Sequence, residues 1–127
     1  MSVEEPTPPN MAALLQRDYW LIRSTPAATT TPTDVEKCAP SHVRWLLGLE
    51  ASGTVLLSGP LLSGPGVAPG AGITVVRADT EQRAVDIANS DPFVITGLRT
   101  FEVFLWRINE GSIGVRLSLG TGTYDWR

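Results

Sequence analysis

The longest uncharged segment, residues 51–76, limits the folds open to this chain. It holds 26 residues without Asp, Glu, Lys or Arg, which is long enough for a membrane-spanning helix. Six glycines and three prolines interrupt the segment, and both residue types disfavour a continuous helix. We therefore interpret residues 54–62 and 73–78 as strands joined by a loop, and we expect neither a membrane span nor a membrane partner.

An amphipathic helix is predicted before this segment, over residues 33–52. Apolar residues recur there at spacings of three and four, which is the period of one helix face. Thr33 with Glu36 forms a capping-box pattern at the start. Pro40 is unfavourable inside a helix, so the regular helix is alternatively expected to begin at Pro40. The inward-facing stripe consists of Val35, Cys38, His42, Trp45 and Leu49.

The remaining patterns give the order β-α-β-β-α-β. This order is that of the ferredoxin-like split βαβ arrangement, an α+β fold with both helices on one face of the sheet. Alternating residues at 113–119, followed by a turn at 120–122, add a half-buried C-terminal strand or hairpin. The first strand is predicted at 19–25, a second helix begins with a capping box of Asp79 and Gln82, and a fourth strand with two buried faces is predicted at 98–107.

The chain length of 127 residues suits one domain. Residues 1–10 are rich in proline and have no periodic apolar pattern, so we expect a disordered tail followed by one domain over 11–127. A chain this short has no element left to cover the second face of its sheet. We therefore predict a homodimer, in which a second copy covers that face.

Charge and cysteine content exclude several classes of function. The net charge is −3, so no basic field is available to gather phosphates, and nucleic acid is not expected as a partner. One cysteine, Cys38, forms no internal disulfide, which suits a reducing cytoplasm. The first residues carry acids and prolines where a secretory signal has a basic end and an apolar run.

His42 and Asp91 are the candidate catalytic residues. His42 is the one histidine, and it lies on the apolar stripe, either as a neutral core residue or as a general base. Asp91 precedes Pro92, which disfavours helical backbone angles at Asp91, so its carboxylate either opens a turn or reaches toward neighbouring elements. If the two meet, the carboxylate orients the imidazole and leaves its other nitrogen facing substrate.

Other chemistry is less well supported by the residue pattern. Cys38 lies four residues before His42, so a thiol nucleophile is one alternative, and a metal site of Cys38, His42 and Asp91 is another. The glycines and prolines of residues 59–72 suit the rim of a pocket, since the loop lacks the GK[ST] end of a phosphate-binding loop. Four arginines are possible anion binders to which the pattern assigns no role: Arg23, Arg44, Arg77 and Arg99.

Three stretches resemble YciI-like proteins, also called the YCII domain. They are SHVRWLLGLEASGTVLLSGPL at 41–61, GITVVRADTEQRAVDIANSDPFVITGL at 72–98, and the strand that ends in FLW. The resemblance implies a dimeric α+β barrel, similar in architecture to muconolactone isomerases, with a pocket beside the His and Asp pair. The residues that it and the aromatic pattern suggest for substrate binding are Gly59, Pro60, Phe93, Trp45 and Ser58.

The resemblance also suggests an activity. Some family members are dehydrochlorinases that act on chlorinated hydroquinones from aromatic breakdown, and residues from 109 onward resemble the extended branch that contains such an enzyme. We expect a small lyase or isomerase that uses His42 and Asp91 without a metal or organic cofactor. The alternative is a dimeric binding or accessory protein whose pocket holds a small molecule without turning it over.

Overall fold

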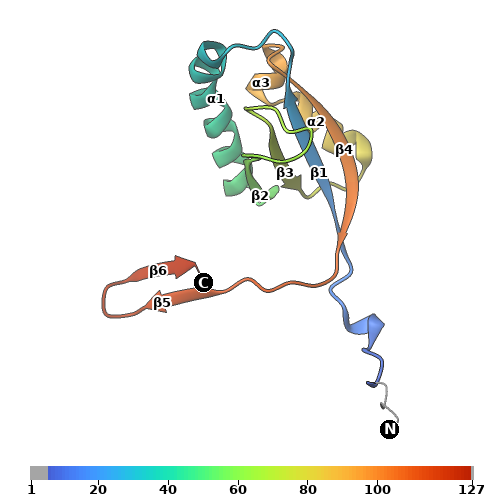
Figure 1. The fold of residues 1–127 in the computed structure, drawn as a ribbon. Helices are drawn as coiled ribbons and strands as arrows, with labels where there is room; N and C mark the ends of the chain where they lie inside the picture. The colour runs from blue at the N-terminus through green and yellow to red at the C-terminus, as the bar shows by residue number, and fades with distance from the viewer. Residues whose placement is uncertain (1–5, 127) are drawn as a thin grey trace. The chain divides into compact units, whose positions relative to one another are not determined.

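The computed structural model describes residues 6–126, which belong to two compact units (Figure 1). Residues 18–107 form the larger unit, and the described residues on either side form the smaller one. In chain order the elements are η1 (Met11–Ala13), β1 (Arg17–Pro26), α1 (Pro32–Ala51), β2 (Val55–Pro60), β3 (Gly72–Val76), α2 (Glu81–Asn89), α3 (Pro92–Ile95), β4 (Arg99–Ile108), β5 (Val115–Ser118) and β6 (Thr123–Trp126).

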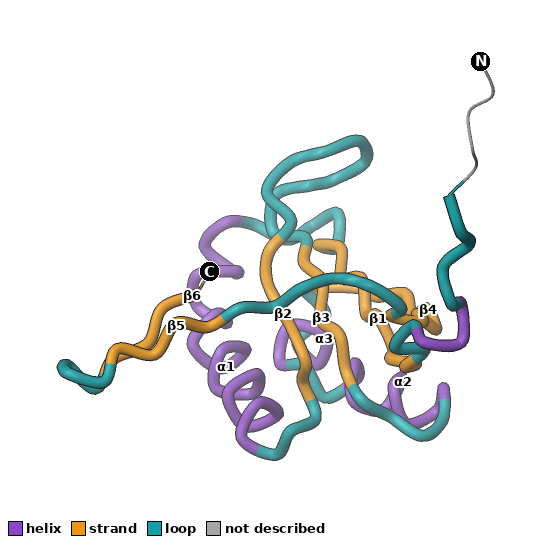
Figure 2. The backbone as a smooth tube through the Cα atoms, turned by 90° about the horizontal axis from the view of Figure 1, so that it is seen from below, coloured by secondary structure: helices purple, strands orange, loops and turns teal. Residues whose placement is uncertain are grey.

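The larger unit has the predicted ferredoxin-like arrangement. Its four-stranded sheet has the order β2-β3-β1-β4, so β3 separates the two strands that flank α1, and β1 separates the two that flank α2. The central pair β1 and β3 is antiparallel, with Ile22 opposite Thr74. Figure 2 shows the strands side by side with the helices on one side of them. Two interleaved crossovers of the same hand place both helices on one face.

Helix α1 starts earlier than the sequence predicts and does not restart at proline. Its N-cap is Thr31, whose hydroxyl accepts a hydrogen bond from the Asp34 backbone N–H, while Asp34 accepts one from the Thr31 N–H. The predicted capping box of Thr33 and Glu36 is therefore wrong, because Pro32 already occupies the first turn. Pro40 lies inside the helix. A continuous α1 carries the His42 stripe along the sheet.

The second crossover ends in a short helix that the sequence does not predict. Thr80 caps α2 by accepting from the Arg83 N–H, so the predicted box of Asp79 and Gln82 is wrong. After α2, Asp91 caps the four-residue helix α3 by accepting from the Phe93 N–H. Its backbone is extended there, as expected before proline. Asp91 is thus fixed by α3 rather than by a simple turn.

The core lies between the helices and the sheet. Val76 is completely buried and packs with Ile22 from β1 and with Ile87 and Ala88 from α2. Burying apolar side chains of this size contributes about 1.5–3 kcal/mol each. This core fixes α2, and hence the start of α3, against the sheet. Partly buried residues around it are Trp20, Trp45, Leu49, Val55, Ala78, Phe101 and Val103.

The face of the sheet opposite the helices is only partly covered. Side chains alternate along a strand, so Phe104 and Trp106 lie on the face opposite the core residues Phe101 and Val103. They are 46% and 42% exposed, and Leu105 is 60% exposed. The prediction that both faces of the fourth strand are buried is therefore wrong for the chain by itself, since no element of this unit covers that end of β4.

The smaller unit contains the predicted C-terminal hairpin. Strands β5 and β6 pair antiparallel, and Gly122 in the turn has the positive φ of +66° that glycine adopts readily. The expected half-burial is wrong, because Val115 and Leu117 are 51% and 69% exposed. One domain over 11–127 remains a prediction, as does the tail over 1–10, of which residues 1–5 lie outside the described residues.

Candidate active site

His42 and Asp91 form a hydrogen-bonded pair. The distance between His42 Nδ1 and Asp91 Oδ1 is 2.8 Å, and their side chains are 13% and 5% exposed. A carboxylate is an acceptor, so Nδ1–H donates and the second ring nitrogen, Nε2, carries the lone pair of the neutral imidazole. Within residues 6–126 no protein atom hydrogen-bonds Nε2. The arrangement therefore supplies an oriented base with a free nitrogen.

Asp91 serves the local fold and the pair at once. Its Oδ1 accepts from the Phe93 backbone N–H at 3.0 Å as well as from His42. The residue is 4% exposed, and a carboxylate this buried requires hydrogen-bond partners. Asp91 therefore reaches a neighbouring element, as one interpretation from the sequence has it, and in place of the simple turn of the other it caps α3 with the same oxygen.

Two aromatic rings flank the imidazole. The Phe93 ring centroid lies 4.6 Å from that of His42, and the Trp45 centroid lies 5.6 Å away. Trp45 Nε1 donates to Ser90 Oγ at 2.9 Å, which ties α1 to the end of α2. The ring of His42 is therefore restrained by contacts as well as by Asp91.

A cavity of about 350 Å³ adjoins His42 between α1 and the β2–β3 edge of the sheet. The polar side chains in its wall belong to His42, Ser58, Thr74 and Arg99, and the Ser58 and Thr74 hydroxyls are hydrogen-bonded at 2.9 Å. The rest of the wall is apolar or backbone, as is common for small-molecule sites. It comprises Val35, Ala39, Val43, Leu46, Gly59, Pro60, Gly70, Gly72, Ile73 and Phe93.

The structure brings most of the predicted site residues to this cavity. His42 and the substrate-binding candidates Ser58, Gly59, Pro60 and Phe93 line it. Asp91 does not line the cavity; its buried carboxylate is hydrogen-bonded to His42 Nδ1. Trp45 does not line this cavity; its indole Nε1 donates to Ser90 Oγ, and a substrate contact by Trp45 stays a prediction.

Arg99 lines the same cavity, although sequence reasoning gave it no role. Its guanidinium carbon lies 4.2 Å from the centroid of the Phe93 ring, which is cation–π geometry. Burial lowers the pKa of the Arg99 guanidinium, and the negative charge of Asp91 acts in the opposite direction. The group stays charged at neutral pH. The available signal was its place at the start of a strand, seven residues after Pro92.

The alternative chemical sites are not assembled. Cys38 Sγ lies 3.8 Å from the Thr96 hydroxyl, and in the described residues it makes no hydrogen bond to His42. No group of three or more His, Cys, Asp or Glu side chains is placed for a metal ion in residues 6–126, so the combination of Cys38, His42 and Asp91 does not form one. None of the described helices is both long and apolar enough to cross a membrane.

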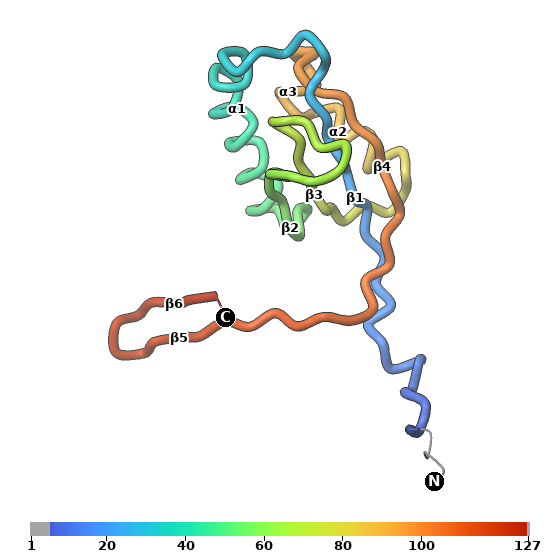
Figure 3. The backbone as a smooth tube through the Cα atoms, viewed as in Figure 1, coloured from blue at the N-terminus to red at the C-terminus, as the bar shows by residue number. Residues whose placement is uncertain are grey.

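A second cavity, of about 530 Å³, lies between the β1–α1 and β2–β3 connections. Figure 3 traces the β2–β3 connection in green between its strands. Val35 and Gly70 line this cavity as well as the one at His42. None of its lining residues is titratable, so we assign the chemistry to the smaller cavity. Its other lining residues are Pro26, Ala27, Ala28, Thr30, Thr31, Pro32, Ala68 and Pro69.

Comparisons with known proteins agree with this architecture. Residues 19–107 match the model of the YCII-related domain. A comparison with curated proteins finds no match. Among solved structures, the chain is similar to 5-chloro-2-hydroxyhydroquinone dehydrochlorinase (TftG) from Burkholderia phenoliruptrix AC1100, in complex with 2,5-dihydroxybenzoquinone, with a TM-score of 0.57 and 20% identity. That similarity covers 69% of this chain and 92% of the other.

Proposed function

Because the chain belongs to the YCII-related domain family, we propose that it is a cytoplasmic lyase or isomerase that moves protons on a cyclic product of aromatic breakdown. The observation that carries the proposal is the 2.8 Å hydrogen bond between His42 and Asp91 at the wall of a cavity. His42 transfers the proton, and Asp91 holds the imidazole in position. The dehydrochlorinase activity of the structural neighbour supports a chlorinated hydroquinone as the substrate to test first.

Loss of HCl from a chlorinated hydroquinone needs only proton transfers. His42 Nε2 takes a proton from the ring hydroxyl next to the C–Cl bond, and the O–H electron pair forms the first carbonyl. The electron pair of the adjoining ring double bond takes the proton back from His42, which forms a C–H bond and makes the chlorine-bearing carbon tetrahedral. His42 Nε2 then takes the proton of the second hydroxyl. The O–H electron pair forms the second carbonyl of the quinone, the ring double bond between them shifts to the chlorine-bearing carbon, and the C–Cl bond breaks with its electron pair on chloride. A positioned acid–base group typically contributes 10²–10⁴-fold to such steps.

Chloride release tests the proposal directly. The wild-type chain is incubated without oxygen with 5-chloro-2-hydroxyhydroquinone and with related chlorinated hydroquinones. Chloride and the quinone absorbance are followed together, and we expect one chloride for each quinone formed. Unsaturated lactones are included to detect isomerisation. Binding of these rings without turnover of any of them would contradict the enzyme and favour the non-catalytic binding protein.

We also propose a homodimer formed through the sheet face opposite the helices. Leu57, Phe104 and Trp106 lie on that face and are 47%, 46% and 42% exposed. Light scattering after size exclusion is expected to give about twice the chain mass of 13.6 kDa. Phe104→Glu is expected to shift the population toward monomer, whereas Leu62→Glu, at a loop position 87% exposed, leaves it unchanged. A stable wild-type species of 13.6 kDa would contradict the dimer.

A further inference from the structure

The guanidinium of Arg99 occupies a defined place in the cavity wall. It lies over the Phe93 ring, and its Nη1 atom is 3.9 Å from the position that a Cβ on Gly72 would take. The same added Cβ would lie 3.3 Å from the Gly59 carbonyl oxygen, so β2, β3 and the guanidinium meet closely at Gly72. Phe93 also contacts His42. One aromatic ring thus supports both the base and the cation.

Arg99 has no partner for its charge in the part of the chain that the structure describes. It forms no ion pair there, and no hydrogen bond from its guanidinium is found. The negative charge of Asp91 acts on Arg99, but no hydrogen bond joins the two in the described residues, and the Asp91 Oδ1 is engaged by His42 and by the Phe93 N–H. A partly buried cation without an acceptor is unfavourable, so an anion placed in the cavity is favoured.

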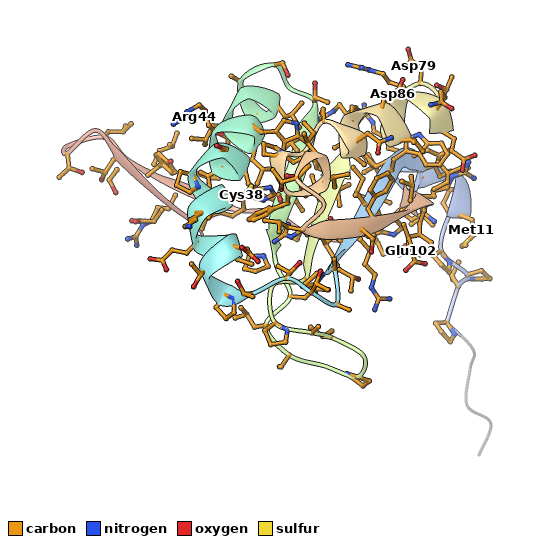
Figure 4. All side chains as sticks on the ribbon, turned by 90° about the horizontal axis from the view of Figure 1, so that it is seen from above. Met11, Cys38, Arg44, Asp79, Asp86 and Glu102 are labelled. Carbon is orange, nitrogen blue, oxygen red and sulfur yellow. The ribbon has the colours of Figure 1, made fainter. Side chains whose placement is uncertain are left out.

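The three other arginines considered from the sequence, Arg23, Arg44 and Arg77, do not line this cavity. Arg77 donates to the Gly53 carbonyl and lies over the Tyr19 ring. Arg44 is exposed and lies on the outer side of α1 in Figure 4. Arg23 lies on β1 opposite Ile73 of β3. Arg99 is therefore the arginine whose position suits a ligand at this site.

We propose that Arg99 is an anion subsite of the His42 cavity and that the ligand is a ring carrying an oxyanion, namely a phenolate or an enolate. This rests on the proposed function. The oxyanion binds the guanidinium while a second ring hydroxyl faces His42 Nε2. When the second O–H bond breaks, the proton forms an N–H bond on His42 and the electron pair stays on the substrate, where Arg99 stabilises the added negative charge.

The test compares two ring probes that differ in charge. 2,5-Dihydroxybenzoquinone is ionised at neutral pH, since each hydroxyl is conjugated to a carbonyl as in a carboxylic acid, and 2,5-dimethoxybenzoquinone is its neutral ether. Calorimetry gives the dissociation constant of each probe, and mass spectrometry checks that Cys38 is unmodified. We expect the wild-type chain to bind the anionic probe about 10-fold or more tightly than the ether, because a charge-assisted hydrogen bond contributes this much.

The variants assign the preference to one residue. Arg99→Gln is expected to remove the preference for the anionic probe while leaving the affinity for the ether within about twofold. Arg99→Lys should retain part of the preference, because it keeps the charge but loses the planar fork. Arg44→Gln is the matched surface control and should behave as wild type.

Two results would overturn the subsite: a wild-type chain without the preference, or an Arg99→Gln variant that keeps it. These readouts are independent of turnover. If no chlorinated ring is turned over but the charge preference depends on Arg99, the proposed enzyme fails and the anion subsite stands. If turnover depends on His42 but the preference is absent, the subsite fails and the enzyme stands.

Discussion

Replacing His42 with alanine is expected to lower turnover of a chlorinated hydroquinone by about 100-fold or more, since removing a positioned acid–base group typically costs this much. The effect should fall on the chemical step. His42 is the one histidine of the chain, it lines the cavity, and its hydrogen bond to Asp91 uses Nδ1 and leaves Nε2 for the substrate. Single-turnover kinetics of quinone formation measure the loss, with Arg44→Gln as a control that keeps the wild-type rate.

Added imidazole distinguishes a base from a packing residue. His42→Ala removes a ring from the wall of the cavity, so free imidazole has room to bind beside Asp91 and restore part of the rate. His42→Gln fills the same space with an amide that is neither acid nor base at neutral pH, and it should not respond to imidazole. A His42→Ala variant within threefold of the wild-type rate would contradict a catalytic role for this residue.

Replacing Phe93 with alanine is expected to lower the free energy of unfolding by about 3–5 kcal/mol, the usual range for a fully buried phenylalanine. The Phe93 side chain is 2% exposed and is among the largest fully buried side chains of the described residues. It contacts the His42 ring and the Arg99 guanidinium, so the cavity left behind also loosens the site. Urea denaturation with linear extrapolation measures the difference.

A matched control lies on the same short helix. Ile95 is 69% exposed, so Ile95→Ala should change the free energy of unfolding by less than about 0.5 kcal/mol. Phe93→Leu, which keeps most of the apolar volume, should fall between wild type and Phe93→Ala. A loss below about 1.5 kcal/mol for Phe93→Ala would mean that the surroundings of Phe93 collapse onto the vacated space, and it would contradict the rigid support inferred here.

The element order and the His42–Asp91 contact could be predicted from the sequence for definite physical reasons. A 3.6-residue apolar period places His42 on the inner face of α1, and Pro92 directs Asp91 out of α2. The chain has one histidine, so an imidazole partner for that carboxylate could only be His42. The fold and this 2.8 Å contact therefore follow from local patterns combined with the topology.

The remaining features depend on contacts between distant segments, and local patterns do not contain them. Several Thr and Asp residues near each helix start fit the capping pattern equally well, so Thr31 and Thr80 were not identified. Trp45 fits an aromatic pocket by type, yet its hydrogen bond to Ser90 depends on how α1 lies beside α2. Arg99 reaches the cavity from the start of β4, and its contacts there, with the Phe93 ring and beside Gly72, join segments that are distant or separately folded.

The shared oxygen of Asp91 links two selective pressures on one residue. Because Oδ1 binds both the Phe93 N–H and His42 Nδ1, any substitution at this position acts on helix α3 and on the imidazole together. The His42 side chain, by contrast, caps no helix. In a relative that has lost the chemistry, we expect this aspartate to be kept for folding, so its presence alone is a weaker marker of activity than a histidine in α1.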